Sequence, residues 1–465
     1  MLPIHCGIFP ITPAQGRQQY FLYFCHTKKP NKNRMTIEPL NIRRVLRSNS
    51  RILKNMSWLA ALQFANCVIP LVLIQYIIST AGLEAFGKIS YAQNIILYLT
   101  VLVNFGFEYS ATQEVALNRD NRKQTNIIFW SVLRSKAVLL AVSFGLLAIG
   151  LIFVDELAAD RRLYIYAALM NIGFAVFPTW FLQGMEDVAK ITVFNFSSRL
   201  IGAVMIILLV TAPNDYPYYL LILSCSYILG GGVALLYVIR KYRLRYTAQN
   251  DSLATRKGLP IFVNNMFATI YSAVGLTMLR YFVSDLDLGL YSAAYKVIMA
   301  VLMIVSYPIS ISLFPSISRR FNESFADGWR FFKRSFFLVV LFGAVCSIAI
   351  FLLSDVVIKL IMGLKNDIPS GDFRASVDIL RIFSLLPILV LAASMLTVQG
   401  MYGLQLQRYA PYIGGAICLF SLAVNYLFIK NIGIQGAAFS YVAAEIVEII
   451  LVGLLIYFNY KKRKQ

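Results

Sequence analysis

Two short stretches decide how this chain is organised: FGKISYA at residues 86–92 and LGLYSAA at residues 288–294. They share the glycine, the serine and the final alanine at one offset. A second pair, LQGM at residues 182–185 and VQGM at residues 398–401, follows in the same order. Short glycine-containing matches also arise by chance between apolar segments, but two matches in one order indicate an internal repeat.

Both pairs lie in long apolar runs. The chain has 465 residues, of which 58% are hydrophobic and 14% charged, against roughly 45–50% and roughly 25% in soluble domains. Mean hydropathy is +0.67. A membrane-spanning helix needs about 20 mostly apolar residues, and about twelve runs meet this. They are residues 56–79, 89–112, 137–154, 162–183, 190–211, 217–239, 259–281, 289–314, 334–354, 378–398, 410–430 and 436–458. Their continuity favours helices over transmembrane strands, so the sequence predicts an all-α integral membrane protein.

The repeat pairs the second and fourth runs with the eighth and tenth, which predicts two six-helix bundles. Six is even, so both halves enter the membrane from the same side and the repeat is parallel. The predicted organisation is a basic leader at 1–54, an N-terminal bundle at 55–239, a basic linker at 240–258, a C-terminal bundle at 259–458 and a tail at 459–465.

The positive charge fixes the predicted orientation. The formal net charge is +21, and most Lys and Arg residues lie in the termini and in alternate connecting segments. The positive-inside rule then places both termini in the cytoplasm, and the charge does not indicate nucleic-acid binding. Residues 1–34 lack the apolar core of a secretory signal. We interpret them as an upstream extension or a misassigned start, with Met35 as the alternative initiator.

Three cations lie in or beside the predicted spans. They are Lys296, Arg199 and Arg280. Intramembrane charges are costly and usually face the protein interior or a water-filled cavity. These cations suit an anionic ligand such as a carboxylate, phosphate or pyrophosphate. Snorkelling to lipid headgroups is the alternative, and it fits Arg280 better than Arg199.

Other polar residues within the spans have several readings. Gln63, Asn66 and Asn94 either line a polar cavity or join helices. Glu445 and Glu448 share one face of the last span at i, i+3. They are candidates for structural pairing, for ion coupling or for contact with another helix.

Signals of catalysis are scarce in the sequence. The two histidines, His5 and His26, lie in the leader, and no phosphate-binding loop of the G-x-x-x-x-G-K-[ST] kind occurs. We therefore predict no catalytic residue, no metal site and no cofactor. Energy would come from a proton or sodium gradient or from removal of the product.

A series of short motifs in a fixed order resembles the polysaccharide transporter family. The motifs are Gln63, Pro70, Gly82, Glu84, Phe86 and Gly87; Asn104-Phe105-Gly106-Phe107 with Ser110-Ala111-Thr112 and Arg119; Pro178, Trp180 and Gln183-Gly184; Leu288-Gly289 with Tyr291 to Lys296; Pro315 to Ser318; and Gly433 to Ala438 with Glu445. The resemblance covers about residues 45–458.

This resemblance implies an O-antigen flippase of the Wzx type, in the superfamily that includes multidrug exporters and the lipid II flippase. The implied fold is two six-helix bundles in a V around a partly cationic cavity. The implied substrate is an undecaprenyl-pyrophosphate-linked oligosaccharide of lipopolysaccharide biosynthesis, moved across the bacterial inner membrane to the periplasmic leaflet. The expected partners are that substrate, the lipid bilayer, and the polymerase and chain-length regulator of the same pathway.

Two alternatives remain open from the sequence. A cation-coupled multidrug exporter of the same fold would be expected to carry an acidic site in one lobe, and the first six spans show no acid near the membrane midplane. A membrane polymerase or glycosyltransferase would be expected to show catalytic residues or long external loops. A purely structural membrane protein leaves the intramembrane charges without a role.

Overall fold

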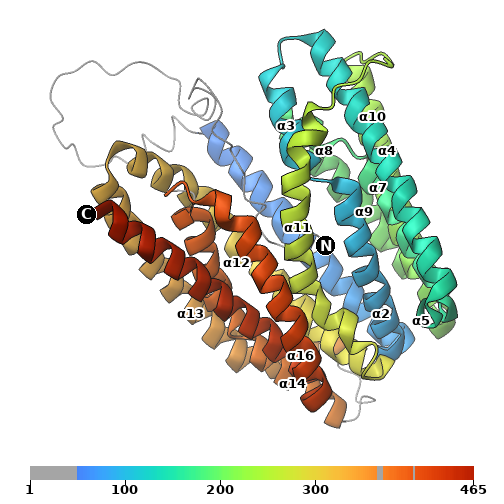
Figure 1. Cartoon of the computed structure of the whole chain (residues 1–465). Coiled ribbons are helices and arrows are strands. Elements are labelled where there is room, and N and C mark those ends of the chain that lie inside the picture. Colours follow the sequence, from blue (N-terminus) through green and yellow to red (C-terminus); the bar gives the residue numbers. More distant parts are fainter. Residues whose placement is uncertain (1–49, 364–369, 402–403, 465) are drawn as a thin grey trace.

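Helices form all the regular structure in the part of the chain that the computed structural model describes, residues 50–363, 370–401 and 404–464. The all-α expectation is confirmed for these residues. Residues 1–49 of the predicted leader, which include the alternative initiator Met35, lie outside the described residues. The side chains of Gln63 and Asn66 also lie outside the described part. We call residues 50–241 the N-half and residues 253–464 the C-half. In Figure 1 most of the N-half lies on the right and most of the C-half on the left, with α11 between them.

The N-half contains α2 (Ser50–Asn104), α3 (Phe107–Leu117), α4 (Arg122–Phe153), α5 (Asp155–Ala159), α6 (Arg161–Ala168), α7 (Met170–Val176), α8 (Thr179–Gly184), α9 (Val188–Leu209), the 3-10 turn η1 (Pro213–Asp215) and α10 (Tyr216–Lys241). The C-half contains α11 (Leu253–Leu279), α12 (Asp285–Glu323), α13 (Phe325–Met362), α14 (Ser370–Phe383), α15 (Leu386–Ser394), the π-helix η2 (Met395–Met401), the 3-10 turn η3 (Gln407–Tyr409) and α16 (Ala410–Lys464).

Ten helical segments of the described chain are long and apolar enough to cross a membrane. Eight of them correspond singly to expected spans. The other two, Val68–Leu117 and Ala410–Lys461, have 50 and 52 residues, which is about 75 Å of helix and enough for two crossings each. Backbone breaks divide them at Gly82 and at Ile432–Gly433. The ten segments therefore cover the twelve expected runs, and the breaks fall where the sequence predicts connecting turns.

The second repeat pair lies in two interrupted spans. The fourth run is divided into α6, α7 and α8, and LQGM ends at the first residue after α8. The tenth run is divided into α14, α15 and η2, and VQGM closes η2. Pro178 and Pro387 stand at the starts of α8 and α15, where a missing N–H prevents continuous helical hydrogen bonding. The repeat thus marks irregular helices at corresponding places in the two halves.

The connection between the halves is shorter than the predicted linker 240–258, because α11 already begins at Leu253. The intervening segment is held against α4. The guanidinium of Arg134 donates to the carbonyl oxygens of Thr247 and Gln249, both at 2.5 Å. The amide of Asn126 donates to the carbonyl of Arg245 at 2.8 Å. The connecting segment is therefore fixed to the N-half.

The first repeat pair forms the tightest contact between the halves. A Cβ at Gly87 of α2 would overlap the backbone of Asp285 and Gly289 of α12. A Cβ at Gly289 would in turn overlap the backbone of Leu83. The two glycines that correspond in the repeat therefore face one another, and their lack of side chains lets the helices meet backbone to backbone. Flanking residues from both helices, including Ile89 and Leu288, are fully buried.

This contact predicts that alanine is not tolerated at either glycine. Gly87→Ala or Gly289→Ala should lower the thermal unfolding temperature of the purified protein, because overpacking against backbone costs about 1–3 kcal/mol. Gly145→Ala is the matched control, since nothing lies near its added Cβ in α4. Equal unfolding temperatures for all three variants would contradict the backbone contact.

Candidate functional site

Lys296 lies on α12 where the two halves meet. It follows Gly289 by seven residues, which is about 10 Å along the helix. Its ammonium donates a hydrogen bond to Oε1 of Gln93 on α2 at 2.7 Å, and it lies 4.9 Å from the ring centroid of Phe86. Both partners belong to the N-half, whereas Lys296 belongs to the C-half. No ion pair joins Lys296 to a carboxylate within residues 50–363, 370–401 and 404–464. Its positive charge is therefore held by an amide and an aromatic face.

Asn94 joins α2 to α11 beside this lysine. Its amide donates to the carbonyl of Ala273 at 3.1 Å and to the hydroxyl of Thr277 at 2.8 Å. The hydroxyls of Tyr98 and Thr277 lie 2.8 Å apart. Asn94 is buried, so of its two predicted roles the structure displays the helix contact. Lys296, Gln93, Asn94, Tyr98 and Thr277 form what we call the central cluster.

Arg199 lies on a different pair of helices. It belongs to α9, and its guanidinium is 5.5 Å from the ring centroid of Tyr227 on α10. Small residues bring these two helices together, because a Cβ at Gly202 or Gly230 would overlap Ser226 or Ser198. The structure therefore seats Arg199 on an aromatic face within the N-half, whereas Lys296 bridges the halves.

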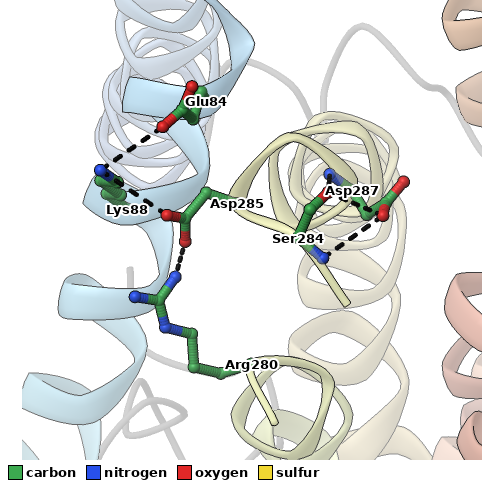
Figure 2. Close-up of polar contacts among 6 residues, drawn as sticks. All are labelled: Glu84, Lys88, Arg280, Ser284, Asp285 and Asp287. Atoms are coloured by element: carbon green, nitrogen blue, oxygen red, sulfur yellow. Dashed lines mark hydrogen bonds and ion pairs between the residues drawn. The ribbon is translucent and has the colours of Figure 1, made fainter. Parts of the chain in front are cut away.

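Arg280 belongs to a group of charges at one end of the contact between the halves (Figure 2). It forms an ion pair with Asp285, which also lies 3.6 Å from the ammonium of Lys88. Lys88 is in turn 3.5 Å from Glu84 one helical turn earlier. Glu84 and Lys88 come from α2, whereas Arg280 follows α11 and Asp285 begins α12. We call these four residues the end cluster. In this conformation the charge of Arg280 is balanced by a carboxylate.

The start of α12 places Asp285 in the end cluster. The hydroxyl oxygen of Ser284 accepts a hydrogen bond from the backbone N–H of Asp287 at 3.2 Å, and the backbone N–H of Ser284 donates to the Asp287 carboxylate at 3.4 Å. This capping box fixes the first helical turn. The carboxylate of Asp285 then lies in a turn where the helix dipole favours negative charge, between Lys88 and Arg280.

Glu445 and Glu448 lie in the second segment of α16. Glu448 accepts hydrogen bonds from the hydroxyls of Thr397 at 3.0 Å and Tyr271 at 3.3 Å. Glu445 is fully buried. Neither of its carboxyl oxygens has a hydrogen-bond partner among the described residues. The predicted pair is therefore close in space, but its two members have different surroundings.

Two lysine contacts with interior groups were not expected from the sequence. Lys136 was assigned to the cytoplasmic connection before the third span, but it is 1% exposed within α4. Its ammonium donates to the carbonyl of Phe174 at 3.0 Å, and its charge interacts with that of Glu108. Lys257, assigned to the linker, lies in α11 and pairs with buried Glu114 of α3 at 2.6 Å. For Lys136, the sequence signal that could have indicated burial was the long apolar run that begins directly after it.

Comparisons with known proteins agree with this architecture. A family model described as "Polysaccharide biosynthesis protein" matches residues 52–321, more than half of the chain. A relative from Escherichia coli (strain K12), named "Putative O-antigen transporter", is 25% identical over 395 residues, with 84% of this chain and 93% of the relative covered. A relative of the same name from Shigella dysenteriae is 22% identical, with 70% of this chain and 82% of the relative covered.

Solved structures of similar fold are membrane transporters. The lipid II flippase MurJ in an inward closed conformation superimposes with a TM-score of 0.65 at 12% identity, over 85% of this chain and 87% of that one. An inward-facing multidrug transporter of the MATE family gives a TM-score of 0.61 at 11% identity, over 85% and 99%. At these identities the likeness establishes the fold.

If the predicted cytoplasmic termini hold, the end cluster faces the outside, and it then predicts an effect of charge removal on access from that side. Asp285→Asn leaves Lys88 and Arg280 facing each other without their shared carboxylate, and a lost charged hydrogen bond costs about 1.5–3 kcal/mol. A cysteine at Gln93, in a chain whose six native cysteines are replaced by serine, should then react roughly tenfold faster with a membrane-impermeant maleimide applied to cells.

The matched control for this experiment is Glu156→Gln, which removes an exposed carboxylate in α5 and should leave the labelling rate unchanged. A rate that is the same with and without Asp285 would mean that the end cluster does not hold the halves together.

Proposed function

This chain belongs to the polysaccharide biosynthesis protein family, and we propose that it is a flippase for lipid-linked oligosaccharide in a bacterial cytoplasmic membrane. The proposed substrate is an undecaprenyl-pyrophosphate-linked repeat unit of O-antigen or a related surface polysaccharide. It moves from the cytoplasmic to the periplasmic leaflet. Such a head group is too polar to cross hydrocarbon alone, whereas its lipid tail is stable in the bilayer.

The observation that supports this proposal most is the position of Lys296. An intramembrane cation is expensive to maintain, and this one is held across the two halves by the neutral amide of Gln93. A pyrophosphate would replace that neutral acceptor with an anionic one, which adds charge–charge attraction to a hydrogen bond whose donor is already ionised. Lys296 thus offers an anion-binding group between the two halves, a position open to a ligand that crosses by alternating access.

The end cluster supplies the second element of alternating access. Its α12 member, Asp285, lies about 16 Å from Lys296 along the helix, at the end of the contact that the positive-inside rule places outside. The ion pairs of Asp285 and the backbone contact at Gly87 and Gly289 close that end. Export of the head group requires these contacts to separate, with the halves meeting instead at the cytoplasmic end.

Arg199 extends this proposal to acidic sugars. Its guanidinium lies on an aromatic face, an arrangement that also suits the planar recognition of carboxylates. Arg280 becomes available to substrate only when Asp285 moves away, so we assign it to the outward-open state. The polymerase and chain-length regulator would receive the product on the periplasmic side.

A cation-coupled multidrug exporter remains the alternative, because the MATE likeness covers most of both chains. Organic cations would need an uncompensated carboxylate between the helices. In the described N-half the two inward carboxylates have cationic neighbours, since Glu108 interacts with Lys136 and Glu114 pairs with Lys257. Within these described residues the N-half therefore offers an organic cation no uncompensated inward carboxylate, and a cation site of that kind would have to lie at Glu445 and Glu448 in the C-half.

The proposal predicts a specific loss of export on removal of the Lys296 charge. In a strain lacking the native gene, Lys296→Met should reduce surface polysaccharide about tenfold or more at matched protein level, since a charged hydrogen bond is worth about 1.5–3 kcal/mol. Lys296→Arg should keep most of the export. Lys430→Met, which removes an exposed lysine at the end of the first segment of α16, is the matched control.

Lipid extracts of the Lys296→Met cells should contain accumulated single repeat units on the lipid carrier. Normal surface polymer in the complete absence of the gene would exclude a flippase for that polysaccharide. Full export by Lys296→Met would remove the assigned role of this lysine.

A further inference from the structure

Glu445 is a buried acid whose surroundings do not satisfy a negative charge. It lies about 18 Å along α16 from the break at Gly433, near the middle of the span, and it is fully buried. Neither carboxyl oxygen accepts a hydrogen bond from the described residues. A carboxylate without partners in such a site costs several kcal/mol or more, so this geometry requires a bound cation or a proton.

The neighbouring groups define which of the two acids carries the charge. Glu448, one turn later, accepts two hydroxyl hydrogen bonds, from Thr397 of η2 and Tyr271 of α11. Hydroxyl donors stabilise the ionised form of a carboxyl group. Glu445 has no such donors, and the nearby negative charge of Glu448 opposes its ionisation. The hydroxyl donors therefore make Glu448 the more readily ionised of the two groups and Glu445 the more readily protonated one.

The other titratable groups around the pair are neutral phenols. Tyr271 of α11 and Tyr441 of α16 interact electrostatically with both glutamates. Tyr291 and Tyr295 of α12 lie beyond Tyr441. Within the described residues, no lysine or arginine is found in an ion pair with either glutamate. The site therefore carries one net negative charge that is not compensated by protein cations.

We propose that Glu445 is a proton-binding site that couples proton entry to export, an inference that rests on the proposed flippase function. From the periplasmic side, the Glu445 carboxylate takes up one proton and becomes a carboxylic acid. After the halves rearrange, the acid releases that proton to the cytoplasmic side. Glu448 has two hydroxyl donors and Glu445 has none among the described residues, so Glu445 is the group that exchanges the proton and one proton moves inward in each cycle.

Two structural features connect this site to the central cluster. The ring of Tyr441 lies 6.3 Å from that of Tyr295, which directly precedes Lys296 in α12. Tyr271 lies six residues before Thr277 on α11, and Thr277 bonds Asn94 and Tyr98 of the N-half. A change in charge at Glu445 therefore acts on α11 and α12, two of the C-half helices that contact α2.

The third feature is the backbone that carries Thr397. It belongs to the π-helix η2 (Met395–Met401), and π segments are rare and frequently occur at functional sites. The widened turn presents the Thr397 hydroxyl to Glu448. The acid site thus combines a buried carboxyl without hydrogen bonds, two oriented donors and an irregular helix.

Infrared spectroscopy of the purified full-length protein tests this proposal without any substrate. The protonated-carboxyl band should be present at neutral pH and disappear in alkaline buffer, and Glu445→Gln should remove the intensity of one carboxyl group. Glu445→Asp should keep a band at a shifted position, which controls for misfolding of the glutamine variant. Glu84→Gln, at a carboxylate that is 67% exposed, should leave the band unchanged. A Glu445→Gln spectrum identical to that of the unchanged protein overturns the proposal.

Sodium provides a second arm of the same experiment. Replacing potassium with sodium at constant pH should not alter the band, and its loss in sodium alone would identify a sodium site instead. In cells, Glu445→Gln should lower surface polysaccharide about tenfold at matched protein level. If the band depends on Glu445 but cells without the gene export normally, the flippase function fails and the proton site stands. Full export by Glu445→Gln overturns the coupling.

Discussion

The structure depends on one contact, the backbone-to-backbone approach of α2 and α12 at Gly87 and Gly289. Only glycine permits this distance, and the two residues occupy the same position in the internal repeat. Their meeting point lies on the boundary between the halves. Both clusters on this boundary follow from it: the end cluster forms within one turn of the contact, and the central cluster forms about two turns further along both helices. A side chain at either glycine would separate both clusters.

The charges along this boundary differ in how they are balanced. At the end cluster Asp285 lies between two cations, so closure of the halves compensates every charge. When the halves are closed, the ammonium of Lys296 contacts only the amide of Gln93 and the ring of Phe86. The interior carboxylates of the N-half are compensated by Lys136 of the same half and by Lys257 of α11 in the C-half. The Glu445–Glu448 pair of the C-half has no ion pair with a lysine or arginine of the described residues. This distribution of charge would be balanced by an anion bound between the halves and by a proton bound in the C-half.

The sequence predicted the span positions well, because long apolar runs and the cost of burying backbone in lipid leave helices as the main solution. Lys296 and the glutamate pair stay predicted site residues, and the structure adds their contacts. The breaks at Gly82 and Gly433 could be placed only roughly, since the turns are too short to interrupt hydropathy. Lys136 was assigned to a loop because hydropathy does not distinguish a helix end at the surface from one inside the protein. The partners of Arg280 depend on contacts between residues far apart in sequence, which no local pattern encodes. The division into two six-helix bundles and the boundaries at 55–239 and 259–458 stay predictions.

The central claim is that Lys296 binds the anionic head of a lipid-linked substrate between the halves. Native mass spectrometry of the full-length protein with undecaprenyl pyrophosphate tests it most directly, because the lipid adduct is observed without transport. The account predicts a bound lipid pyrophosphate that is lost in Lys296→Met and kept in Lys430→Met. Equal adduct intensity in the two variants would contradict it.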